Sequence, residues 1–200
     1  MCTTKIRIAC FATFVAVAFS HAALAMDPAS VPTGKRTSQG LYLTAAEAHA
    51  HMTESGAQTL FVDVRSRAEA QFVGVPSSVD AIVPLKEFSE FGEFDEASGA
   101  YRLVENAAFV EELTKRLAAK GLTKADVVIV ICRSGSRSAR AVDLLAKAGY
   151  ARVYSVVDGF EGDKAKAGPH KGHRMVNGWK NQNLPWGYRL EKAKLAQVSW

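Results

Sequence analysis

The stretch that decides the fold is Val127–Arg140, which reads VVIVICRSGSRSAR. Five apolar β-branched residues lead directly into Cys132, and such a run is typical of a strand buried on both faces of a parallel sheet. The residues after the loop carry apolar side chains at helical spacing up to Ala148, and Gly149 stands where a helix would end. The stretch therefore predicts a strand, a tight loop and a helix. Its cysteine lies at the carboxyl end of a central strand, where open α/β sheets bind ligands.

The loop after the strand favours a reactive thiolate over a buried structural cysteine. Backbone N–H groups of a short loop that enters a helix converge on one point, and the helix dipole adds positive potential there. Such a site stabilises a thiolate and binds an oxyanion such as sulfate, thiosulfate or phosphate. We expect the substrate contacts to come from Arg133, Ser134, Gly135, Ser136 and Arg137. For Arg137 the alternative is a structural salt bridge to Asp63 or Glu69.

Two kinds of anion-binding cysteine loop fit this pattern. Cysteine phosphatases have an arginine six positions after the cysteine, but here that position is Ser138, and Arg137 falls one residue earlier. The loop is therefore one residue short for a tetrahedral phosphate. The phrase CRSGSRS from Cys132 to Ser138 instead closely resembles the active loop of rhodanese sulfurtransferases, which carry a sulfane sulfur as a cysteine persulfide.

A segment before the loop strengthens the resemblance. The usual amino-terminal signature of a rhodanese domain is matched by Asp63-Val-Arg65, Glu69, Gly74-Val-Pro76 and Ile82-Val-Pro84-Leu85. The chain departs from the family pattern at Val75, where histidine is usual, and at Ser77-Ser78, where Gly-Ala is common. We expect supporting roles behind the loop for Asp63, Arg65, Ser138 and Arg140. Asp63 either pairs with a loop arginine, which we prefer, or orients the active loop.

A third part of the resemblance follows the active loop. Arg152–Val157 predicts another strand, and Asp158–Gly162 resembles the glycine-containing turn with an aromatic residue that rhodanese domains have there. The similarity then covers residues 41–162. It implies an α/β three-layer domain with a mostly parallel central sheet.

The first 25 residues are typical of a signal peptide. Lys5 and Arg7 precede an apolar run, and Ala23-Leu-Ala25 is a small-x-small cleavage site. The apolar run is shorter than the ~20 residues that a membrane span needs. We therefore expect a periplasmic or secreted protein that begins at Met26 and does not enter the membrane after cleavage. Cleavage removes Cys2 and Cys10, and a lone thiol that remains in an oxidising compartment points to a function.

The rest of the chain yields local predictions. Residues 26–40 are expected to form an exposed, flexible leader, and residues 163–200 a loop and an aromatic tail that packs on the domain. Residues 86–104 read as an insertion, in which Glu93–Val104 predicts a β-hairpin with Ser98-Gly99 in its turn. Its aromatic residues are expected to form a satellite core, with an aromatic ligand-binding wall as the alternative: Phe88, Phe91, Phe94 and Tyr101. Asn106 is expected to cap a helix over 107–120.

Charge and histidine spacing exclude some functions. The formal net charge of +5 falls by two when Lys5 and Arg7 leave with the signal, too weak a charge to indicate nucleic-acid binding. His49 and His51 lack the spacing of a helical metal pair, and His170-x-x-His173 has no cysteine or carboxylate cluster beside it. We expect no metal site and no cofactor.

The resemblance implies a two-step sulfur transfer. The Cys132 thiolate takes a sulfane sulfur from thiosulfate or a related small anionic donor and passes it to cyanide or a thiol. A protein thiol is a further candidate acceptor. The alternative is a non-catalytic persulfide carrier or binding module. A cysteine phosphatase or arsenate reductase fits less well, because the loop is short.

Overall fold

The computed structural model describes residues 26–198, so the expected signal peptide lies outside the described residues. The centre of the fold is a five-stranded sheet with the order β1-β10-β9-β2-β4. All neighbouring strands in it are parallel, which confirms the predicted parallel central sheet. Its strands are β1 (Tyr42–Leu43), β2 (Thr59–Asp63), β4 (Ala81–Ile82), β9 (Val127–Ile131) and β10 (Arg152–Val156).

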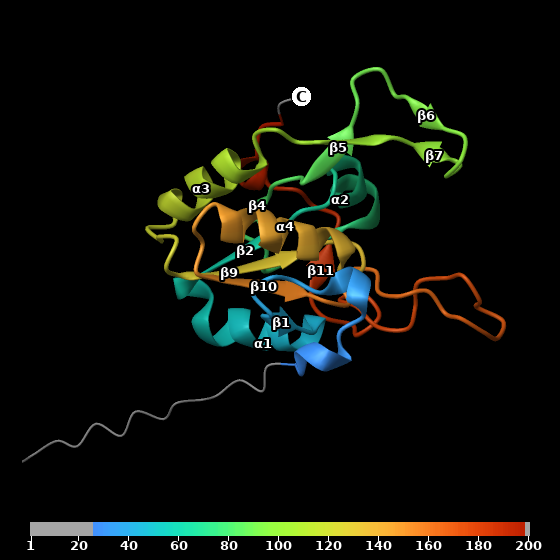
Figure 1. Ribbon diagram of the computed structural model, residues 1–200, viewed down its shortest axis with the longest axis horizontal. Helices are drawn as coiled ribbons and strands as arrows, with labels where there is room; N and C mark the ends of the chain where they lie inside the picture. Colours follow the sequence, from blue (N-terminus) through green and yellow to red (C-terminus); the bar gives the residue numbers. More distant parts are fainter. Residues whose placement is uncertain (1–25, 199–200) are drawn as a thin grey trace, which may run out of the picture.

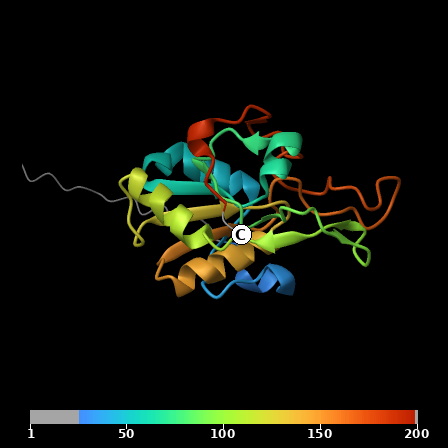
Figure 2. The same cartoon turned by 90° about the horizontal axis from the view of Figure 1, so that it is seen from above.

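Helices cover both faces of this sheet (Figure 1; Figure 2). Apolar residues of α1 (Ala45–Ser55) and α2 (Arg67–Val73) pack with one face, and those of α3 (Phe109–Ala119) and α4 (Ser136–Lys147) pack with the other. The split follows the two-residue period of a strand. In β9, Val128 and Val130 join the α3 and α4 side, whereas Ile129 and Ile131 join the α1 and α2 side. Both faces of β9 are thus buried, which produces a three-layer α/β domain.

Local sequence signals determine where the helices begin. Thr44 with Glu47 and Ser66 with Glu69 both form capping boxes, in which each side chain bonds the backbone N–H of the other residue. The expected start of α3 is wrong: the helix begins at Phe109, not at residue 107. The reason is that Asn106 closes a turn before the helix: its side chain accepts the Ala108 N–H at 3.1 Å, and its carbonyl accepts the Phe109 N–H at 3.0 Å.

The insertion forms two antiparallel ribbons. β5 (Lys86–Phe88) pairs with β8 (Leu103–Glu105), and β6 (Phe94–Asp95) pairs with β7 (Ala100–Tyr101) in the expected hairpin. The expected satellite core is wrong, because Phe91, Phe94 and Tyr101 are 87%, 50% and 59% exposed. The hairpin projects away from the domain (Figure 1), and the Tyr101 ring contacts the rings of Phe88 and Phe94 edge to face.

The two ends of the described chain lie on the domain. Residues 26–40, expected to be an exposed leader, contain the short 3₁₀ helices η1 (Pro28–Ser30) and η2 (Thr33–Lys35), and Val31 between them is buried. In the tail, Trp179 is fully buried against Phe61. The remaining short elements are β11 (Trp186–Gly187), which pairs with β3 (Val75–Pro76), and the 3₁₀ helices η3 (Gly56–Gln58) and η4 (Lys192–Lys194). No helix within residues 26–198 is long and apolar enough to cross a bilayer.

Candidate functional site around Cys132

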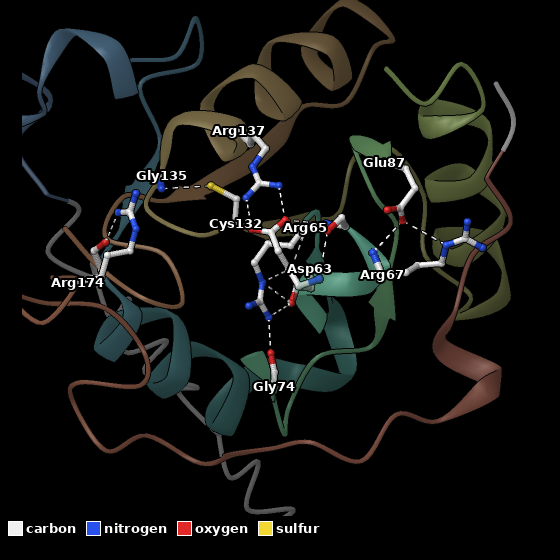
Figure 3. Close-up of polar contacts among 12 residues, drawn as sticks. Asp63, Arg65, Arg67, Gly74, Glu87, Cys132, Gly135, Arg137 and Arg174 are labelled. Atoms are coloured by element: carbon white, nitrogen blue, oxygen red, sulfur yellow. Dashed lines mark hydrogen bonds and ion pairs between the residues drawn. The ribbon is translucent and has the colours of Figure 1, made fainter. Parts of the chain in front are cut away.

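Cys132 follows the last residue of β9 and lies inside the loop that opens α4 (Figure 3). Its Sγ accepts a hydrogen bond from the Gly135 N–H at 3.2 Å, and the residue is 1% exposed. Gly135 is the N-cap of α4 and has a left-handed φ of 98°, which turns its N–H back toward the sulfur. The predicted combination of strand end, cysteine, converging N–H group and helix start is therefore present.

The turn after β10 supports this loop from behind. The Phe160 N–H donates to the Cys132 carbonyl at 2.8 Å, and the N–H groups of Glu161 and Gly162 donate to the Arg133 carbonyl at 3.0 and 3.2 Å. A side chain at Gly135 would overlap the backbone of Val157. The carbonyls of Cys132 and Arg133 are thus bonded to residues 160–162, on the other side of the loop from the Gly135 N–H that bonds the sulfur.

The guanidinium of Arg137 forms an ion pair with the carboxylate of Glu69. Its two terminal nitrogens reach the two carboxylate oxygens of Glu69 at 2.6 and 2.5 Å, and both side chains are 17% exposed. Burial raises the pKa of Glu69, but the hydrogen bonds and charge of Arg137 outweigh it and hold that pKa at about 2. Burial likewise opposes the charge on Arg137, whose pKa is nevertheless raised by Glu69 and by Cys132. The arginine therefore joins α4 to α2 beside the sulfur.

A second ion pair lies deeper behind the loop. Arg65 donates to both carboxylate oxygens of Asp63, at 2.6 Å for the shortest contact, and both side chains are fully buried. Arg65 also donates to the Gly74 carbonyl at 2.7 Å, and its guanidinium lies 4.1 Å from the centre of the Phe160 ring. Asp63 does not pair with an arginine of the active loop as expected, because its carboxylate binds Arg65, two residues along the chain. Because Phe160 bonds Cys132, the pair contacts the loop through one intermediate residue.

The other predicted site residues divide into two groups. Arg133 and Ser136 are exposed and Ser134 is half-buried, so these three reach the surface of the loop. Ser138 is fully buried, and Arg140 points to Glu105 of β8 at 3.0 Å. Within residues 26–198, no three His, Cys, Asp or Glu side chains are grouped closely enough to hold a metal ion.

Two residues near the loop were not found from the sequence. Arg174 donates to the Gly162 carbonyl at 2.7 Å. Burial and the neighbouring charge of Arg133 lower its pKa, and the charge of Cys132 opposes that shift. Lys35 reaches Asp163 at 2.7 Å and lies against Gly135. No sequence motif identifies either residue, because the two lie on segments more than a hundred residues apart. The lysine-rich composition of residues 163–173 was a sequence signal for positive charge near the site.

Asp158, just after β10, ties three segments together. Its oxygens accept hydrogen bonds from the Ala45 N–H at 2.8 Å, the Gly178 N–H at 3.2 Å and the Gln182 side chain at 3.1 Å. Burial raises the pKa of this carboxyl group, and the hydrogen bonds oppose the rise. The start of α1 and the tail are thereby held against the turn that supports the active loop.

Comparisons with known proteins agree with this geometry. The crystal structure of Rv0390 from M. tuberculosis is 31% identical and aligns with a TM-score of 0.55 over 74% of this chain and 96% of that chain. An uncharacterized protein of Rickettsia conorii is 27% identical over 144 residues, 68% of this chain and 89% of that protein. A family model described as Rhodanese-like domain matches residues 44–166. This chain belongs to the rhodanese-like domain family.

Proposed function

We propose that this protein is a sulfurtransferase that moves a sulfane sulfur through a persulfide on Cys132. The observation that carries the proposal is the 3.2 Å hydrogen bond from the Gly135 N–H to Cys132 Sγ at the start of α4. Backbone N–H groups and a helix N-terminus stabilise both a thiolate and the terminal sulfur of a persulfide, which is also an anion.

The first half-reaction takes sulfur from thiosulfate or a related anionic donor. The Cys132 thiolate attacks the outer sulfur of thiosulfate, a new S–S bond forms, and the donor's own S–S bond breaks. Its electron pair leaves with sulfite, so no external oxidant or reductant is needed. The loop N–H groups from Ser134 to Ser136 and the exposed Arg133 guanidinium hold the anion.

The second half-reaction returns the free thiolate. Cyanide or a thiolate attacks the terminal sulfur of the persulfide, and the bond between that sulfur and Cys132 Sγ breaks. The electron pair of this bond stays on Cys132. The product is thiocyanate or the persulfide of the acceptor.

Arg137 argues against phosphate chemistry. A cysteine phosphatase needs an arginine that grips the phosphoryl oxygens in two places, whereas the fork of Arg137 is bound by the Glu69 carboxylate. This geometry agrees with the short loop found in the sequence.

Mass spectrometry with thiosulfate tests the proposal. The protein is expected to gain the mass of one sulfur atom and to lose it on addition of cyanide, with thiocyanate released. Cys132→Ser should abolish both the adduct and turnover. Release of phosphate from an aryl phosphate at comparable efficiency, without a sulfur adduct, would overturn the assignment.

A persulfide carrier is the second candidate, and the burial of Cys132 favours it. Cys132 is 1% exposed, so its sulfur is shielded from small molecules in bulk water, and sulfur exchange with a protein that docks on the loop is favoured. A carrier would load one sulfur per chain but discharge it to cyanide far more slowly than it loads. Rates for the two half-reactions, measured separately, distinguish the carrier from the enzyme.

We further propose that the chain is exported and processed before Met26. The support is the basic segment, apolar run and Ala23-Leu-Ala25 site in the sequence. The intact mass of periplasmic material should correspond to a chain that starts at Met26. A mass that still includes residues 1–25 would refute this proposal.

A further inference from the structure

A groove of about 950 Å³ lies beside the active loop. Its walls come from three segments that are distant in sequence: the leader with Lys35, the active loop with Ser134 and Ser136, and residues 163–176. The last segment projects from the same end of the domain as the start of α4 (Figure 1; Figure 2). A space of this size accommodates a ligand of many atoms, so it is far larger than thiosulfate requires.

The groove is strongly basic. Five cationic side chains line it, together with one carboxylate, Asp163: the cations are Lys35, Lys164, Lys166, Lys171 and Arg174. Lys35 already neutralises Asp163 at 2.7 Å. Lys164, Lys166 and Lys171 are exposed, and within residues 26–198 their side chains have no ion pair or hydrogen bond. Three positive charges in this groove are therefore available to a ligand.

Backbone hydrogen bonds hold these lysines in place. Residues 164 and 174 form an antiparallel β-bridge, the Ala165 N–H donates to the His173 carbonyl at 2.9 Å, and the Gly172 N–H donates to the Ala165 carbonyl at 2.8 Å. Arg174 anchors the same ribbon to the Gly162 carbonyl at 2.7 Å. Gly162 in turn bonds the active loop, so the ribbon is joined to the loop by consecutive hydrogen bonds.

We propose that this groove is a subsite for the acceptor, and that it binds the carboxylates of a small thiol while its sulfur attacks the persulfide. The inference rests on the proposed function and names the class of acceptor. Lysine ammonium groups act as point charges that suit carboxylates without demanding one geometry. Three of the five cations, Lys35, Lys171 and Arg174, lie outside the family match of residues 44–166, so segments that flank the family match contribute to the subsite.

The transfer step at this subsite is balanced. The acceptor thiolate attacks the terminal sulfur, one S–S bond forms on the acceptor, and the bond to Cys132 Sγ breaks with its electron pair returning to Cys132. The carboxylates take no part in the chemistry. They raise the local concentration and fix the orientation of the acceptor, so they affect its apparent affinity.

The experiment compares two acceptors with the persulfide form of the protein. Mercaptosuccinate carries two carboxylates, and mercaptoethanol is neutral. Replacing two lysines, Lys164→Gln with Lys166→Gln, should slow discharge to mercaptosuccinate about 5–20-fold at low ionic strength, because each exposed ion pair contributes modestly and is screened by salt. Discharge to mercaptoethanol, which is neutral, should change less than about twofold.

A matched control removes the same charge elsewhere. Lys147 and Lys192 are exposed and do not line the groove. The variant Lys147→Gln with Lys192→Gln should therefore leave the rate of discharge to both acceptors unchanged. The inference would be overturned if the groove variant slowed discharge to both acceptors equally. It would also be overturned if the control variant slowed discharge to mercaptosuccinate as much as the groove variant does.

A second measurement separates failure of the groove from failure of the proposed function. The thiol of Cys132, without added sulfur, is treated with dithiobis(nitrobenzoate), a disulfide with two carboxylates, and with neutral dithiodipyridine. The ratio of the two rates should fall about 5–20-fold in the groove variant and stay constant in the control. If no persulfide forms but this ratio falls, the sulfurtransferase proposal fails and the anion-binding groove stands. If the persulfide forms but neither assay shows a preference for the anionic reagent, only the groove is refuted.

Discussion

Removing the side chain of Arg137 is expected to destabilise the fold far more than it weakens binding of the sulfur donor. Both members of the Arg137–Glu69 pair are 17% exposed, so Arg137→Ala leaves a buried carboxylate without its partner. Breaking a buried pair costs about 3–5 kcal/mol. The pKa of Glu69, about 2 against 4.5, corresponds to about 3 kcal/mol by linkage, at about 1.4 kcal/mol per tenfold change in proton affinity. We expect a loss of about 3 kcal/mol at pH 7.

The pH dependence identifies the pair as the cause. Because the pKa of Glu69 is lower in the folded chain than in the unfolded one, its contribution to stability is fully present above pH 4.5 and is lost as the pH falls through about 2. The stability difference between wild type and Arg137→Ala should therefore be about 2 kcal/mol smaller at pH 3 than at pH 7. Urea unfolding followed by tryptophan fluorescence at the two pH values measures it.

Two further variants complete the test. Arg102→Ala breaks a pair with Glu93 whose side chains are 61% and 54% exposed, and it should cost no more than about 0.5 kcal/mol at either pH. The double variant Arg137→Ala/Glu69→Ala removes both charges and should recover about half of the lost stability.

The kinetics of the double variant provide the refuting result. If it remains stable but its kcat/KM for thiosulfate is still reduced about 10–100-fold, the loss expected for a charge-assisted contact, Arg137 binds the donor. An Arg137→Ala protein as stable as the wild type would show that the contact with Glu69 contributes nothing.

Two other substitutions probe the support of the loop, each with a control elsewhere in the chain. Gly135→Ala should destabilise the protein by more than about 3 kcal/mol, because the new methyl group overlaps Val157 in addition to the left-handed strain of about 1–2 kcal/mol. The control is Gly121→Ala, where φ is 72° and the space is open, so this substitution should cost only the backbone strain. Equal melting temperatures for the two variants would contradict the close approach of Gly135 to Val157. Trp179→Ala should lower the free energy of unfolding by about 3–5 kcal/mol, measured by calorimetry, since the ring is fully buried. The control Phe91→Ala should change the free energy of unfolding little, because that ring is exposed. A small effect at Trp179 would mean that the tail is not part of the core.

Local signals predicted the strand, loop and helix around Cys132. The apolar run before Cys132 has one stable placement, the middle of a parallel sheet. The predicted start of α3 was two residues early, because Asn106 accepts the N–H groups of Ala108 and Phe109 in a separate turn before the helix. The aromatic insertion was taken for a core because composition reports hydrophobicity but not what lies nearby to cover it.

The sequence by itself determined the strand, loop and helix around Cys132 and hence the family, because these depend on neighbours only a few residues apart. Only the tertiary structure decided how two arginines after Cys132 are used: Arg137 pairs with Glu69, and Arg140 pairs with Glu105. It also brought Lys35 and Arg174 to the loop. Charged side chains on distant segments come together only when the strands have assembled in the order of the sheet. The positions of these residues in the sequence do not show which partner will lie within about 3 Å.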